Sequence, residues 1–141
     1  MKKLTLFLIS MTFQALLFSQ KQGNIWMFGQ GGGLDFNSGT PTVVLGSQVF
    51  GNPQPGYYLY SEGCCSIADP NGKLLFYSNG DKVWNKFHQI MPNGNNLLGL
   101  YSSTQSALAI PMPLSDSLYY LFTTDVMERY LANGLRFSII N

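Results

Sequence analysis

The sequence predicts an all-β protein made of antiparallel sheets, and three observations support this. Turn residues recur about every 8 to 12 residues, as in β-sandwiches and β-propellers. The segments between the turns are rich in β-branched and aromatic residues. One strand–turn–strand pattern occurs twice, in residues 66–77 and 107–122, about 42 residues apart. Because a propeller blade repeats every 40 to 50 residues or so, this spacing predicts a radial β-repeat.

The first 20 residues have the pattern of a secretory signal peptide. Lys2 and Lys3 precede an apolar run over residues 4–18, which ends at Ser19 and Gln20. A membrane anchor is the weaker interpretation, because polar residues interrupt the run and it is shorter than the ~20 apolar residues of a spanning helix. We therefore expect a signal peptide at residues 1–19, export across the inner membrane, and no membrane insertion after cleavage.

Charged side chains are sparse and scattered. The chain has 8 Lys and Arg against 7 Asp and Glu, which gives a formal net charge of +1. No basic patch of the kind that binds nucleic acid or an anionic membrane can be assembled from them. Neutral polar residues at outward strand positions would suit an exported β protein.

The first part of the mature chain predicts two strands separated by a glycine-rich loop. We expect a short aromatic strand at residues 24–28 and a β-branched strand at residues 42–45. The glycine-rich segment between them is expected to be a flexible connection: Gly29-Gln30-Gly31-Gly32-Gly33. A phosphate-binding role for the loop is disfavoured, because Leu34 and Phe36 stand where nucleotide-binding patterns need Gly.

The next part contains the clearest turn signals. The breaker at residues 51–56 precedes a possible edge strand at 57–60. Residues 64–68 and 73–78 form a hairpin around Asp69-Pro70-Asn71-Gly72, in which Pro presets one φ and Asn-Gly supplies positive φ. Asn79-Gly80 then reverses the chain into residues 81–86, and another turn follows at 91–94.

The last part repeats the pattern. We expect strands at residues 106–110 and 117–123. Residues 125–132 have two interpretations: Asp125 and Glu128 are spaced like a capping box for a short helix, whereas Asn133-Gly134 before residues 135–139 favours a hairpin. We favour the hairpin.

The chain is short for a complete propeller. A closed ring needs at least four blades of ~40 residues, and about 120 mature residues hold fewer than three. We therefore expect residues 20–141 to be an incomplete β-propeller-like domain of about two to three blades within a larger repeat protein. Its last strand would leave an unpaired edge, and Leu135, Phe137 and Ile139 would share one uncovered apolar face.

The reactive residue types lack the spacing of known sites. His88 is the single histidine, and Cys64 and Cys65 are adjacent, so neither a catalytic triad nor a protein-only zinc site is expected. Because neighbouring strand residues point to opposite faces, two separately buried thiols are favoured over a vicinal disulfide or pairing to segments beyond this chain. His88 is expected to hydrogen-bond in the turn before Met91.

Carboxylates beside turns could bind calcium, but no loop matches a calcium consensus and turn chemistry explains them equally. They are Asp35, Asp69, Asp81 and Asp125. No spacing selects a glycosidase pair of acids. Aromatic residues could stack on sugars, although strand aromatics usually fill cores: Trp26, Tyr57, Tyr58, Trp84, Tyr119 and Tyr120. We assign no catalytic, cofactor-binding or metal-binding residue and expect no cofactor.

Several segments together resemble one family of surface proteins. They are residues 24–29, 33–39, 62–64, 69–72, 83–85, 88–94, 102–107 and 134–138. They look like the amino-terminal region of large secreted Bacteroidota proteins of the gliding-motility-associated or PKD-domain-containing type, which commonly carry a sorting domain for type IX secretion. The resemblance covers nearly all of the mature chain and implies an extracellular, propeller-like β region without catalysis.

The resulting expectation is a noncatalytic interaction module, secreted or at the cell surface, within a gliding-motility-associated or adhesin-like protein. Its expected partners are an extracellular or cell-surface protein or glycan, and downstream domains of the same protein. The competing function is the propeller portion of a secreted carbohydrate-active enzyme, itself catalytic or not.

Overall fold

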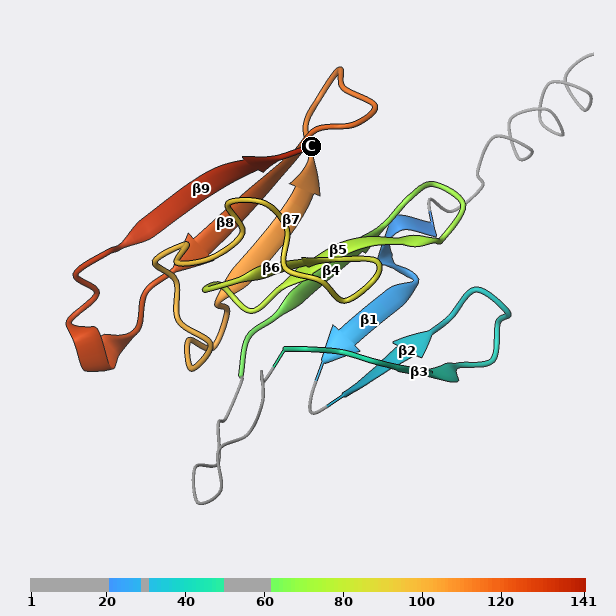
Figure 1. Ribbon diagram of the computed structural model, residues 1–141, viewed down its shortest axis with the longest axis horizontal. Coiled ribbons are helices and arrows are strands. Elements are labelled where there is room, and N and C mark those ends of the chain that lie inside the picture. Colours follow the sequence, from blue (N-terminus) through green and yellow to red (C-terminus); the bar gives the residue numbers. More distant parts are fainter. Residues whose placement is uncertain (1–20, 29–30, 50–61) are drawn as a thin grey trace, which may run out of the picture.

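The computed structural model describes residues 21–28, 31–49 and 62–141 (Figure 1). Over these residues the protein is all-β, with nine short strands in three separate antiparallel sheets. The only helices described are two single 3₁₀ turns, η1 (Lys21–Gly23) and η2 (Met127–Arg129). The prediction of an all-β protein of antiparallel sheets is therefore confirmed. None of the helices described is long and apolar enough to cross a membrane.

Each sheet is a three-stranded meander in chain order. Sheet 1 contains β1 (Ile25–Phe28), β2 (Gly32–Asp35) and β3 (Thr42–Leu45). Sheet 2 contains β4 (Cys65–Ala68), β5 (Leu74–Ser78) and β6 (Val83–Asn85). Sheet 3 contains β7 (Ala107–Pro111), β8 (Tyr119–Thr124) and β9 (Leu135–Ile140).

The sheets repeat at a nearly constant spacing. Their first strands begin at residues 25, 65 and 107, so successive sheets are offset by 40 and then 42 residues. The spacing between the two copies visible in the sequence thus also separates sheet 1 from sheet 2. The sheets have three strands rather than the four of a typical blade, and over the described residues they do not close into a ring.

Sheet 1 corrects the interpretation of the glycine-rich segment. β1 and β3 lie where the sequence predicts strands, but Gly32 and Gly33 belong to β2 and pair with Phe28 and Met27. Gly33 is buried where a Cβ would collide with the Trp26 carbonyl oxygen, so the strand needs glycine for close approach. The rest of that loop at residues 29–30, and the segments predicted at 1–19, 51–56 and 57–60, lie outside the described residues.

The hairpin predicted in sheet 2 is confirmed. Gly72 has a φ of +84°, and the Asp69 carboxylate accepts hydrogen bonds from the backbone N–H groups of Asn71 at 2.8 Å and Lys73 at 3.0 Å. The register shifts after Ile67, where β4 meets β5. These bonds close the turn with groups that are at most four residues apart, which is why the local sequence alone predicts it.

The β8–β9 hairpin is also confirmed, and the capping-box alternative is wrong. The residue before η2 is Val126, which makes no side-chain cap. Asp125 instead accepts from the N–H groups of Val126 at 2.9 Å and Asn133 at 2.8 Å. The acid therefore closes the connection between the strands, and η2 is one turn within that connection.

Two apolar cores lie between the three sheets, which are stacked face to face. The first core joins sheet 1 to sheet 2 and contains Ile25, Met27, Val49, Ala68, Tyr77 and Trp84. The second joins sheet 2 to sheet 3 and contains Ile67, Phe76, Val83, Ala107, Tyr119 and Leu121. β1 contacts β4 and β4 contacts β7, so the first strands of the sheets lie together at one side of the stack (Figure 1).

Candidate interaction surfaces

The three first strands share a groove of about 400 Å³. Its walls are residues 26–28 of β1, residues 64–66 at the start of β4, and Gln105, Leu108 and Ala109 at β7. Because each first strand is a sheet edge, its outward backbone groups need partners. Side chains supply some of them: Gln105 Nε2 donates to the Ala107 carbonyl at 2.8 Å.

Ser66 joins sheet 2 to the free edge of β1. Its hydroxyl donates to the Ile25 carbonyl at 2.6 Å and accepts from the Met27 N–H at 3.2 Å. The β1 edge beside the groove is thereby blocked against pairing with another strand. Across the second core, the Ser106 hydroxyl donates to the Gly63 carbonyl and ties the start of β7 to the start of β4.

The two cysteines are free thiols that belong to different cores. Cys64 packs against the first core and Cys65 against the second, as strand alternation predicts. Burial raises the pKa of the Cys64 thiol, and burial, with a smaller contribution from Cys64, raises the pKa of Cys65 to about 12. Both thiols are therefore protonated and weakly nucleophilic at neutral pH, which is the opposite of a redox centre.

His88 links sheets 1 and 2. Its backbone N–H bonds the Asn85 carbonyl at 3.0 Å within the predicted turn, but its ring lies 3.1 Å, Nδ1 to hydroxyl oxygen, from Tyr77. That hydroxyl also accepts the Gln48 N–H at 3.1 Å, so the Tyr77 oxygen connects the chain that leaves sheet 1 to the His88 ring. Gly46 packs against the other side of the ring. The histidine has a structural partner on each side, and no local sequence signal identifies them.

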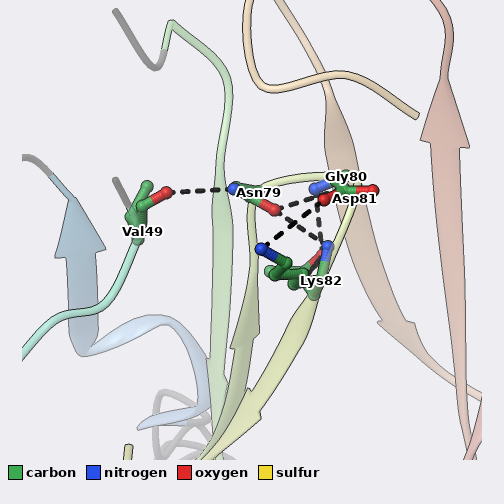
Figure 2. A network of polar contacts seen from close by, with 6 residues as sticks. Val49, Asn79, Gly80, Asp81 and Lys82 are labelled. Atoms are coloured by element: carbon green, nitrogen blue, oxygen red, sulfur yellow. Dashed lines mark hydrogen bonds and ion pairs between the residues drawn. The ribbon is translucent and has the colours of Figure 1, made fainter. Parts of the chain in front are cut away.

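A second polar link lies at the β5–β6 turn (Figure 2). The Asn79 side-chain oxygen accepts the N–H groups of Asp81 at 3.1 Å and Lys82 at 2.9 Å, and its amide donates to the Val49 carbonyl at 3.0 Å. Figure 2 shows these bonds converging on Asn79, with the 4.0 Å contact between the Asp81 carboxylate and the Lys82 ammonium beside them. Asn79 thus closes its own turn and holds the chain that leaves sheet 1.

The other acids considered for calcium serve turns in the same way. Asp35 accepts the Asn37 N–H at 2.7 Å. Backbone hydrogen bonds, chiefly from Lys73 and from Asn133, lower the pKa values of Asp69 and Asp125. Within the part of the chain that the structure describes, no three His, Cys, Asp or Glu residues are grouped as metal ligands would be.

The outer face of sheet 3 is apolar and exposed. Leu135, Phe137 and Ile139 share it with exposed fractions of 69%, 62% and 55%, so the predicted placement of these three residues is confirmed. Ring centroids of Tyr120 and Phe122 lie 6.1 and 6.3 Å from that of Phe137 on the same face. We call this surface the sheet-3 face; it comprises Leu108, Ile110, Tyr120, Phe122, Leu135, Phe137 and Ile139.

The outer face of sheet 1 is also apolar, which the sequence-based interpretation missed. Trp26, Val43 and Leu45 are 54%, 73% and 74% exposed, and the Trp26 ring lies 4.9 Å from that of Phe36. We call this surface the sheet-1 face; it comprises Trp26, Phe28, Leu34, Phe36, Val43 and Leu45. The sequence does contain a signal for this face: all four residues of β1 are apolar, so the strand has apolar side chains on both of its faces.

The candidate sugar-stacking aromatics therefore divide by location. Trp84 and Tyr119 fill the cores, Trp26 and Tyr120 lie on the outer faces, and residues 57–58 lie outside the described part of the chain. Comparisons with protein-family models, with curated proteins and with solved structures found no match for this chain. The fold class thus rests on the structure itself.

Proposed function

We propose that the chain is a noncatalytic interaction module formed by three consecutive blades of an incomplete β-propeller. The observation that carries this proposal is the stack of three three-stranded meanders, offset by 40 and 42 residues, in which the first strands of neighbouring sheets lie side by side. β4 and β7 start together at Gly63 and Ser106 and run in the same direction, as the first strands of neighbouring propeller blades do. β1 runs opposite to β4, because Asn24 at its start lies beside Asn37 and Gly72 at the end of β4. The exposed apolar faces at both ends of the stack are compatible with an open arc of blades.

The absence of catalysis is argued from the reactive groups themselves. The His88 ring is engaged by Tyr77 and packed against Gly46, and the Cys65 thiol has a raised pKa in the second core. The carboxylates of Asp35, Asp69 and Asp125 are engaged in turns. A noncatalytic module needs only surfaces, and the groove at the first strands offers apolar and amide groups from Trp26 and Gln105 to a partner.

The partner we propose is a protein or glycan outside the cell or at its surface. The leader-like pattern of residues 1–19 and the resemblance to gliding-motility-associated and adhesin-like proteins support this location. Scattered charge argues against nucleic acid as the partner. Stacking of a sugar ring or a peptide side chain on Trp26 is the contact that the groove favours.

The experiment uses the full chain expressed with its own leader. Mass spectrometry of exported material should find an amino terminus at residue 20 or 21, and a retained Met1 would contradict secretion. The purified protein is then screened against glycan arrays and surface-protein extracts, with Trp26→Ala as the groove variant and Leu114→Ala as an exposed control. Binding that Trp26→Ala weakens and Leu114→Ala leaves unchanged supports the module, whereas hydrolysis of a bound glycan would replace it with the enzyme alternative.

A further inference from the structure

A pocket of about 320 Å³ lies between sheets 2 and 3, apart from the groove at the first strands. Its apolar floor contains Leu75, Met91 and Ile140, and the polar side chains that line it include those of Asp69, Asp116 and Tyr119. Tyr119 of β8 pairs with Ile140 of β9, so the pocket lies near the end marked C in Figure 1. Because its volume is near the lower end of the ~300 to 1,000 Å³ of small-molecule pockets, it suits one side chain or one small molecule.

The Tyr119 hydroxyl is a polar group at this pocket that lacks a partner. Tyr119 is 8% exposed, and its ring packs edge-on against Phe76 with the centroids 5.5 Å apart. The Tyr77 hydroxyl makes two hydrogen bonds in the first core, whereas that of Tyr119 makes none with any described residue. Burial, with a smaller contribution from the nearby Asp69 charge, raises the pKa of Tyr119, so the hydroxyl stays protonated. Since buried tyrosine hydroxyls usually have a partner, this one indicates a position for a ligand.

The Asp69 carboxylate has one oxygen left for a ligand. Its Oδ1 accepts the N–H groups of Asn71 and Lys73, but within the described ranges no group donates to Oδ2. The only ion pair among these residues joins Asp81 to Lys82, so no ammonium neutralises Asp69 at contact distance. Asp116 is exposed and lines the same pocket. The pocket therefore combines two carboxylates and a phenol oxygen with an apolar floor.

We propose that this pocket binds an alkylammonium group, of the kind that a lysine side chain presents. An ammonium group has three donors, one each for Asp69 Oδ2, the Tyr119 hydroxyl and the Asp116 carboxylate, and its methylene stem packs on the apolar floor. A guanidinium group fits less well, because its bidentate contact needs both oxygens of a carboxylate, and Asp69 Oδ1 already accepts two N–H groups. The proposal goes beyond the function proposed above and does not depend on the groove.

A titration of the isotope-labelled full chain with butylammonium chloride, followed by NMR, tests the proposal. The backbone amide signals of Lys73, Ser117 and Tyr119 should shift and saturate. The uncharged analogue 1-butanol has the same stem and should bind at least about tenfold more weakly, because it lacks the charge-assisted hydrogen bonds. Nα-acetyl-lysine N-methylamide separates the two sources of the group: tighter binding than butylammonium indicates a lysine of a partner protein, and equal or weaker binding indicates a free amine.

Two variants test the roles of the polar groups. Tyr119→Phe and Asp116→Asn should each weaken butylammonium binding about twofold to tenfold. Glu128→Gln is the matched control, because it removes an exposed charge of η2 outside the pocket, and it should leave binding unchanged. Tyr119→Phe should also leave the urea midpoint unchanged, since its hydroxyl has no partner to lose, so weaker binding would not reflect unfolding.

Four results would each overturn the proposal. They are equal binding of 1-butanol, unchanged affinity in both pocket variants, an equal loss of affinity in Glu128→Gln, and shifts confined to the groove residues Trp26 and Leu108. A lower urea midpoint for Tyr119→Phe would also contradict it, because the hydroxyl would then have a partner within the protein.

Discussion

Replacing Gly72 with alanine tests how the tip of the sheet-2 hairpin is locked to sheet 1. The Gly72 carbonyl accepts a hydrogen bond from Asn37 Nδ2 at 2.8 Å, and the Asn37 oxygen accepts one from Asn24 at 3.2 Å. A Cβ on Gly72 would overlap the Asn37 side chain, and the φ of +84° adds backbone strain. Strain costs roughly 1 to 2 kcal/mol and loss of the Asn37 bond about 1 kcal/mol, so we expect a loss of ~2 to 3 kcal/mol in the free energy of unfolding.

Gly39→Ala is the matched control for the strain alone. Gly39 has a φ of +82°, but a Cβ there meets nothing within 4 Å. Urea denaturation followed by tryptophan fluorescence should give a Gly72→Ala loss about 1 kcal/mol larger than that of Gly39→Ala. In a double-mutant cycle, Asn37→Ala should make the Gly72→Ala change smaller, because the overlapping side chain is gone. Equal losses for the two glycines, or strict additivity with Asn37→Ala, would refute the proposed contact.

Three further predictions concern buried and titrating groups. Tyr77→Phe should lower the free energy of unfolding by about 1 to 3 kcal/mol, because the Gln48 N–H loses its acceptor, and a urea titration with a change near zero would contradict this. Iodoacetamide at pH 8 should alkylate Cys65 roughly 1000-fold more slowly in the folded than in the urea-unfolded protein, since burial raises its pKa from the ordinary 9.0 to about 12. The free energy of unfolding that comes from keeping this thiol protonated is present below pH 9.0 and is lost as the pH rises toward 12. Equal alkylation rates would disprove the burial of Cys65. The hydrogen bond from the Lys73 N–H lowers the pKa of Asp69 below 3.8, so Asp69→Asn should lower the free energy of unfolding at neutral pH, and this loss should shrink as the pH falls below 3.8. A difference in urea midpoints that does not change with pH would exclude the Asp69 charge as the source of the loss.

The parts of the fold that the sequence predicted are the ones encoded locally. The turn at residues 69–72 needs only its own Pro, Asn and Gly and the Asp69 carboxylate, and the structure shows it as expected. The glycine-rich composition predicts a loop at Gly32 and Gly33, but both lie in β2. At Gly33 the neighbouring Trp26 backbone leaves no room for a Cβ, and sequence periodicity does not reveal such a close approach. The hairpin between β8 and β9 forms as predicted, and its connection contains one 3₁₀ turn, η2, without the capping box that Asp125 and Glu128 suggest.

The candidate interaction surfaces also divide into features that the local sequence predicts and features that it does not. The alternation of Leu135, Phe137 and Ile139 predicted one exposed face, because a strand has a period of two. The pairing of His88 with Tyr77, and the meeting of the first strands around the groove, depend on how whole sheets stack. Such contacts join residues that no local pattern connects, so they could be found only from the structure.

The apolar runs of the outer strands bear on what covers them. A strand with one solvated face alternates apolar and polar residues, whereas a strand covered on both faces is apolar throughout. β5 of the middle sheet has the second pattern and is covered on both sides. β1, with Ile-Trp-Met-Phe, and the start of β8, with Tyr-Tyr-Leu-Phe, have it too, although each has one side open. The outer sheets thus have the composition of inner layers: β1 and β8 are apolar on the exposed face as well as on the face that lines a core.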